Sequence, residues 1–88
     1  MADALTVDIV APDRTVWSGT ASRVIAPSIE GEVGLLASHE PLLAILKAGT
    51  VRVTSESGKH EFPVTGGFVS FDHNTITIVA DAVATDKD

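Results

Sequence analysis

The chain of 88 residues contains no cysteine and has an aromatic content of only 5%. Without cysteine there is no disulfide framework, no thiolate metal site and no cysteine nucleophile, so packing alone must hold the fold together. A module that binds sugars or peptides would need a cluster of exposed aromatic side chains. The aromatic residues available for this are Trp17, Phe62, Phe68 and Phe71. We expect most of them inside the fold, with Trp17 as a core or half-buried anchor.

Long apolar runs and positive charge are also scarce. No apolar stretch approaches the roughly 20 residues that a membrane span needs, and no basic segment precedes an apolar one at the N-terminus. Lys+Arg 6 against Asp+Glu 12 gives a formal net charge of −6. We therefore expect a soluble chain made in the cytoplasm, without direct membrane insertion. We expect no nucleic-acid partner, because nucleic-acid binders concentrate positive charge on one face, whereas the lysines and arginines here are scattered in an acidic chain.

The overall composition is that of a globular domain. An apolar fraction of 44% with 20% charged residues provides enough aliphatic surface for collapse. We expect a single domain that spans residues 1–88, because this length leaves no room for a second one. So short a chain buries only about 60 to 65% of its unfolded surface, which makes additional stabilisation by a partner surface plausible.

Hydrophobic periodicity predicts strands along almost the whole chain. Apolar and polar residues alternate with a period of two in residues 5–9 and 50–54. Residues 75–79 are all β-branched, and the period places Ile76 and Ile78 on the opposite face from their threonine neighbours. The predicted turns between the strands contain Pro12-Asp13, Ser57-Gly58, Gly66-Gly67 and His73-Asn74. Eight or so short strands spaced in this way indicate an all-β antiparallel sandwich or flattened barrel.

Prolines and glycines determine where several predicted strands end. We expect Pro27 to end one strand, and Pro63 to lie on a sheet edge because proline cannot donate to a ladder. The glycines of residues 29–36 indicate a turn, after which Leu35 and Leu36 return to the core. Residues 38–49 suit a helix or a strand, and Pro41 favours a loop followed by a brief strand.

No pattern of residues predicts catalysis or a cofactor. His39, His60 and His73 fall in or beside predicted turns without metal-ligand spacing, so we expect them to be solvated. Ser38, His39 and Glu40 are adjacent, and neighbours on an extended chain point to opposite sides, which prevents a catalytic relay. The glycine pairs at 31–34 and 66–67 lack the lysine and helix of a phosphate loop. We therefore expect no catalytic residue, metal or cofactor.

A lipoyl- or biotin-carrying domain is an alternative from another functional class. Such modules are small acidic β-sandwiches with a lysine at a hairpin tip, and Lys59 follows the predicted turn at Gly58. The surrounding residues lack the attachment motif of that family. A second alternative is a free-standing sugar- or peptide-binding module, which the aromatic content disfavours.

Three ordered segments of the sequence resemble the epsilon subunit of bacterial F-type ATP synthases. Residues 5–19, LTVDIVAPDRTVWSG, resemble its first hairpin. Residues 24–53, VIAPSIEGEVGLLASHEPLLAILKAGTVRV, are similar to its EGE-x-G signature, the following H-x-PL and a later G-x-[VI]-x-[VI] strand. Residues 62–83, FPVTGGFVSFDHNTITIVADAV, resemble its closing strands. The order and spacing of these segments over residues 5–83 carry the resemblance.

The resemblance implies a β-sandwich of about ten strands in a central rotor, at the cytoplasmic face of the cell membrane. The implied partners are the gamma subunit and the c-ring, with no catalysis and no small-molecule substrate. Carried over residue by residue, the surface toward the c-ring consists of Glu30, Gly31, Glu32, Val33, Gly34, Ser38, His39, Glu40, Pro41, Leu42 and Leu43. Within it, Glu32 is expected to meet a basic loop of the ring, and His39 to help shape the same surface.

The chain departs from the family pattern at its C-terminal end. Bacterial members usually continue into a helical hairpin that inhibits ATP hydrolysis and in some cases binds ATP, whereas this sequence ends at Asp88. We therefore expect it to couple rotation without that hairpin's regulation or its nucleotide binding.

Overall fold

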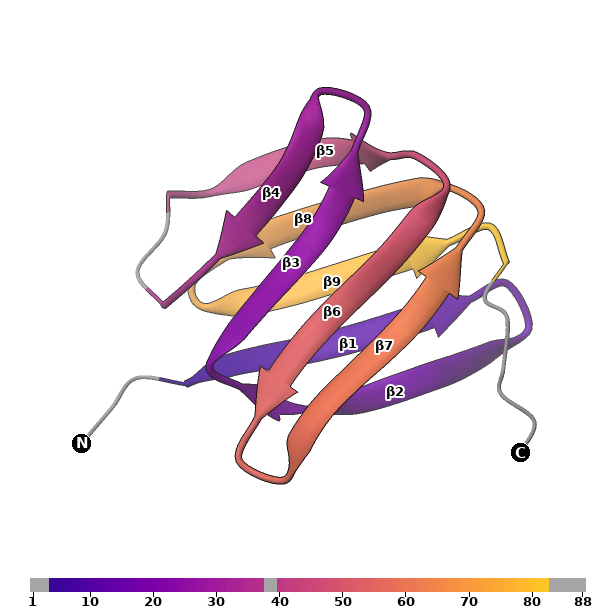
Figure 1. Ribbon diagram of the computed structural model, residues 1–88. Helices are drawn as coiled ribbons and strands as arrows, with labels where there is room; N and C mark the ends of the chain where they lie inside the picture. The colour runs from indigo at the N-terminus through magenta and orange to yellow at the C-terminus, as the bar shows by residue number, and fades with distance from the viewer. Residues whose placement is uncertain (1–3, 38–39, 83–88) are drawn as a thin grey trace.

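The computed structural model describes residues 4–37 and 40–82, most of which lie in β-strands, and it contains no helix in these ranges (Figure 1). The strands, as the structure has them, are β1 (Leu5–Ala11), β2 (Arg14–Ala21), β3 (Arg23–Ser28), β4 (Gly31–Leu35), β5 (Leu42–Leu46), β6 (Gly49–Ser55), β7 (Gly58–Val64), β8 (Gly67–Asp72) and β9 (Thr75–Ala80). Strand β5 confirms the predicted loop and brief strand after Pro41, and residues 75–79 form a strand as predicted.

The strands form one curled sheet that folds over itself into a sandwich. Their order is β2-β1-β9-β8-β5-β3-β6-β7, and β4 pairs with β3 outside this path. Figure 1 shows β4, β3, β6 and β7 crossing in front of the layer that contains the other five strands. Between β3 and β5 only Ser28 and Leu46 are aligned, so the sheet turns its corner there. The all-β sandwich predicted from the sequence is confirmed.

One strand pair departs from an entirely antiparallel arrangement. Strands β1 and β9 are parallel, in a register that runs from Thr6 opposite Thr75 to Val10 opposite Val79. Antiparallel pairing is favoured where a short turn joins two strands, whereas parallel strands need a long connection. Almost the whole chain lies between β1 and β9, so no tight turn restricts their relative direction.

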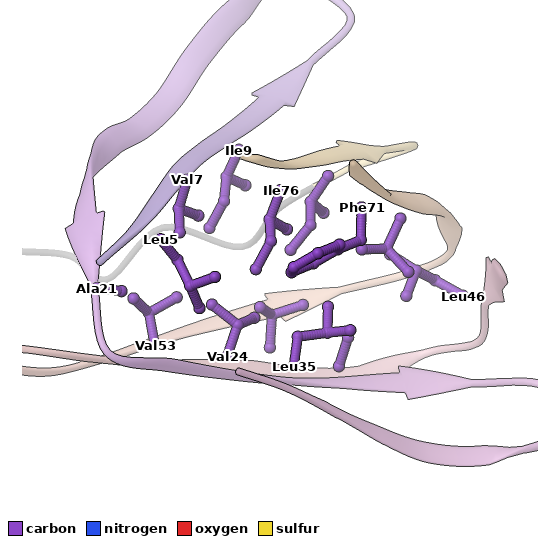
Figure 2. Close-up of a cluster of buried hydrophobic side chains, with 14 of the residues drawn as sticks. Leu5, Val7, Ile9, Ala21, Val24, Leu35, Leu46, Val53, Phe71 and Ile76 are labelled. Carbon is purple, nitrogen blue, oxygen red and sulfur yellow. The ribbon is translucent and has the colours of Figure 1, made fainter. Parts of the chain in front are cut away.

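The core lies between the two layers and is entirely aliphatic apart from Phe71 (Figure 2). Its residues occupy alternate positions of their strands, as in Leu5, Val7 and Ile9 of β1. Ile76 and Ile78 of β9 are likewise fully buried, which confirms their predicted face. No buried side-chain nitrogen or oxygen within residues 4–37 and 40–82 lacks a hydrogen-bond partner. In the described part of the core, no polar side chain is left without a hydrogen bond, a condition that would reduce stability.

An aromatic cluster packs at the border of this core. The ring centroid of Trp17 lies 5.2 Å from that of His60 and 6.1 Å from that of Phe62. Trp17 is half-buried, as predicted. The prediction that His60 is a solvated turn residue is wrong: it is half-buried on β7, opposite the buried Val53, so its side chain lies on the inward face of that strand.

The remaining local predictions have mixed outcomes. His73 and Asn74, with φ of 51° and 59°, form the predicted two-residue turn, and His73 is 92% exposed. Pro63 lies on β7 at the end of the sheet, as predicted. Pro27 does not end its strand, because β3 continues to Ser28 and the carbonyl of Pro27 accepts a hydrogen bond from Lys47 N–H. Leu36 is 54% exposed and does not return to the core.

Candidate docking surface

The β3–β4 hairpin is held at its turn by one buried serine. Ser28 Oγ donates a hydrogen bond to the Gly31 carbonyl at 2.5 Å and accepts one from Glu30 N–H at 3.2 Å. Gly31 has φ of 122°, a conformation that side chains rarely adopt, so glycine is needed there. These contacts fix the direction in which the exposed residues after Ser28 point.

Backbone hydrogen bonds attach this turn to strand β5. Ile29 N–H donates to the Ile45 carbonyl at 3.0 Å, and Lys47 N–H donates to the Pro27 carbonyl at the same distance. The hairpin and β5 together enclose a shallow groove of about 370 Å³. We call it the hairpin groove, and it is lined by Ser28, Ile29, Glu30, Gly31, Glu32, Val33, Leu42, Leu43, Ala44 and Ile45.

The groove brings together two separate parts of the sequence that were predicted to share one surface. Residues 30–33 lie along one side of it, and Leu42 and Leu43 lie along the other. Gly34, Glu40 and Pro41 are exposed but do not line the groove. Ser38 and His39 lie outside the described residues, so the structure does not test them. Most of the first segment is strand β4 and not a loop, because Gly31–Leu35 pairs with β3.

The charged side chains that line the groove are both carboxylates. Glu30 and Glu32 are both exposed. Neither carboxylate is in an ion pair with another residue that the structure describes. Both carboxylates are therefore available to a cation of a partner.

Exposed aliphatic side chains line the groove, and of these the sequence analysis had placed only Leu43 on the predicted surface. Ile29 is 60% exposed, Leu43 73% and Ile45 58%. Ile45 also begins an apolar row across the outer face of the sheet, opposite Phe68 of β8, which in turn is opposite Val79 of β9. The continuous apolar run of residues 42–46 was a signal for this surface, because a strand must direct every second residue away from its own core.

The described residues contain no cluster of metal-binding side chains. Within them, no group of three or more histidine, aspartate or glutamate side chains could hold a metal ion. The same residues form no helix long and apolar enough to cross a membrane. Lys59 is exposed on strand β7, opposite Thr54, and not at the hairpin tip where a carrier domain holds its lysine.

Comparison with known families decides the assignment. Residues 4–86 match the β-sandwich domain of the ATP synthase delta/epsilon chain. The chain belongs to this family. The resemblance found in the sequence is confirmed, and the match leaves the carrier-domain and free-standing-module alternatives without support.

Relatives of the delta/epsilon family are similar over most of this chain. It is 45% identical to the ATP synthase epsilon chain of Cyanothece sp. over 80 residues, which cover 89% of this chain and 56% of that protein. It is 43% identical to the epsilon chain of Streptomyces griseus over 82 residues, or 92% of this chain and 66% of that protein. The chain thus spans between about half and two thirds of the length of these relatives.

Solved structures share the delta/epsilon fold at lower identity. A chain in the cryo-EM structure of the Euglena gracilis mitochondrial ATP synthase, described as OSCP/F1/c-ring, aligns with a TM-score of 0.86 and 23% identity. The match covers 92% of this chain and 52% of that one. A chain of the Tetrahymena thermophila mitochondrial ATP synthase, described as central stalk/c-ring, aligns with a TM-score of 0.77 and 19% identity over 94% of this chain and 67% of that one. These likenesses confirm the sandwich fold.

Proposed function

We propose that this chain is the β-sandwich of a non-catalytic rotor subunit in a proton-translocating F-type ATP synthase. It connects the gamma subunit to the c-ring at the cytoplasmic face of the membrane, and rotation passes through it during ATP synthesis. The observation that carries the proposal is the family match over residues 4–86, in a fold where residues 30–33 and 42–43 of the two predicted contact segments line one groove.

The proposed contact with the c-ring is the hairpin groove and the exposed residues beside it. Glu32 and Glu30 would meet basic side chains of the ring, and Leu43 would pack against its apolar loop atoms. Gly34, Ser38, His39, Glu40 and Pro41 would complete this surface. Gamma would bind the sandwich elsewhere, so that both partners turn with it.

The energetics of rotation require an extended contact. One translocated charge contributes about 2.3 kcal/mol per 100 mV, whereas one exposed ion pair contributes roughly 0 to 1 kcal/mol. A single salt bridge at Glu32 could not keep two parts of a rotor from slipping. We therefore expect a total buried area of at least about 1,200 Å², within which Glu32 adjusts the fit.

Co-purification from bacterial membranes tests the proposal at its simplest level. The tagged chain, expressed in cells that contain the ATP synthase, is expected to bring gamma and the c-ring with it after detergent extraction. Recovery of the chain without either of these subunits would contradict the proposal.

Charge reversal tests the groove itself. We expect Glu32→Arg to leave the fold intact, because the side chain is exposed, and to weaken attachment to the ring through like-charge repulsion. The matched control is Glu56→Arg, since Glu56 is exposed at the β6–β7 turn, at the opposite end of the sandwich from the hairpin groove (Figure 1). ATP-driven proton pumping in membranes should fall for the first variant and not for the second. Equal pumping by both would remove Glu32 from the contact.

A further inference from the structure

Half of the chain's positive charge lies on the outer face of one layer. Arg23, Arg52 and Lys59 are three of its six lysine and arginine residues, and they are scattered along the sequence. The strand register places them on neighbouring strands of one surface: Thr54 pairs with both Arg23 and Lys59, and Arg52 lies two positions before it on β6. All three side chains are exposed. We call this surface the basic face.

The basic face keeps a net positive charge among the residues that the structure describes. None of its three cations is in an ion pair with any residue that the structure describes. One carboxylate, Glu61, lies opposite Arg52. The four groups sum to +3 − 1 = +2, in a chain whose formal net charge is −6. The rest of the chain therefore carries −6 − 2 = −8, and the basic face is a local exception to an acidic surface.

The geometry of this face does not suit a small anion. Its hollow of about 240 Å³ is shallow, and Arg23 and Lys59 are two strands apart, or about 10 Å. The two side chains thus start from separate strands, and the shallow hollow between them does not enclose an anion. Strand β6 is paired on both sides, so its backbone N–H groups are committed to the sheet and form no anion-binding nest.

The composition of the face also disfavours a uniformly anionic surface. Glu61 lies among the cations and would repel a phosphate backbone or an anionic bilayer. Ile25 lies beside Arg52 on the same face and offers an apolar contact. The basic face thus combines separated cations with one carboxylate and one aliphatic side chain. These features are complementary to a polypeptide in which acidic residues alternate with basic or apolar ones.

We propose that the basic face docks an acidic, extended segment of a neighbouring subunit. This inference rests on the proposed function. Strand β3 runs from Arg23 in the basic face to the turn of the hairpin groove, so one strand connects the two surfaces. A rotor subunit would thus use two oppositely charged surfaces, an acidic end and a basic side. Contact through both surfaces would fix the orientation of the sandwich relative to two neighbouring subunits.

Site-specific photo-crosslinking in the assembled ATP synthase tests this. A benzoylphenylalanine replaces Thr54, at the centre of the basic face, and in parallel Leu43 at the hairpin groove. After irradiation, mass spectrometry identifies the linked peptide. We expect the Thr54 position to link to a subunit peptide rich in aspartate and glutamate.

Charge reversal in the same complex provides the matched comparison. Arg23→Glu, Arg52→Glu and Lys59→Glu together should reduce the Thr54 crosslink roughly fivefold or more, because three exposed attractions become repulsions. Arg14→Glu, on β2 outside this face, should leave it unchanged.

Each other outcome overturns the inference in a distinguishable way. A crosslink from Leu43 without one from Thr54, or a Thr54 crosslink to lipid, nucleotide or a peptide without acidic residues, overturns the inference alone. Absence of crosslinks from both positions overturns the proposed function together with it.

Discussion

At the scale of single residues, Ser28 and Gly67 each fix the backbone at one connection between strands. Ser28 is 2% exposed, and its hydroxyl group joins both sides of the β3–β4 turn. Gly67 begins β8 with φ of 132°, and a Cβ there would overlap the carbonyl oxygen of Val79. Removal of the hydroxyl group from Ser28, or addition of a methyl group to Gly67, therefore tests each role separately.

Replacing Ser28 by alanine should lower the free energy of unfolding by about 1 to 2 kcal/mol. The change removes two hydrogen bonds at a buried site, and the Gly31 carbonyl loses its hydroxyl donor. Ser18→Ala is the control, because Ser18 bonds to Asp8 at an exposed position and should contribute less than about 0.5 kcal/mol. Urea denaturation of both variants measures the difference, and equal losses would contradict the role assigned to Ser28.

Gly67→Ala should destabilise the fold by at least about 2 kcal/mol, because the positive φ and the overlap with β9 add together. Gly34→Ala is the matched change on β4, where an added Cβ meets nothing within 4 Å. It should alter stability by less than about 1 kcal/mol. Thermal unfolding of the two variants compares them directly, and a stable Gly67→Ala protein would show that β8 and β9 lie farther apart.

At the scale of strands, the alternation of apolar and polar residues predicted which side chains face the core, but not which strands pair with each other. The period of two identified the inward faces of β1 and β9, since burial of one face is what selects that period. It carries no information on which strand lies alongside, so the parallel pairing of β1 with β9 was not predicted. The apolar run of β5 does not alternate, which concealed the outward Leu43 and Ile45.

The residues of the candidate surface were also only partly predictable from the pattern of the sequence. Its two segments were expected together because of the family resemblance, and no periodicity linked Glu30 to Leu43 across the intervening chain. The inward position of His60 depends on its register with Val53, which a turn prediction cannot supply. The clustering of Arg23, Arg52 and Lys59 likewise follows from register alone.

Strand β8 offers a matched test of its two faces. Phe71 is 1% exposed and lies in the core, whereas Phe68 is 42% exposed on the outside. Phe71→Ala should reduce the free energy of unfolding by about 3 to 5 kcal/mol, and Phe68→Ala by less than about 1 kcal/mol. If Phe71→Ala does not fold, Phe71→Leu gives a graded loss in its place. Chemical denaturation that ranks Phe68 above Phe71 would reverse the assigned faces.

At the scale of the whole molecule, a sandwich of two packed layers suits a part that must transmit force. Its core is continuous across both layers, so a load applied at one end deforms many packed contacts at once. The surface is divided by charge: the carboxylates of the hairpin groove lie at one end, and the basic face lies on the outside of β3, β6 and β7. A rigid body with distinct surfaces can hold two neighbours in a fixed relation.

The orientation of the sandwich in an assembled rotor is the most direct test. A cryo-EM reconstruction of the purified ATP synthase that contains this chain should show the turn between β3 and β4, with Glu32 and Leu43, against the polar loops of the c-ring. A sandwich that meets the ring through the β6–β7 turn at Glu56, or an enzyme fully assembled without this chain, would contradict the proposed docking.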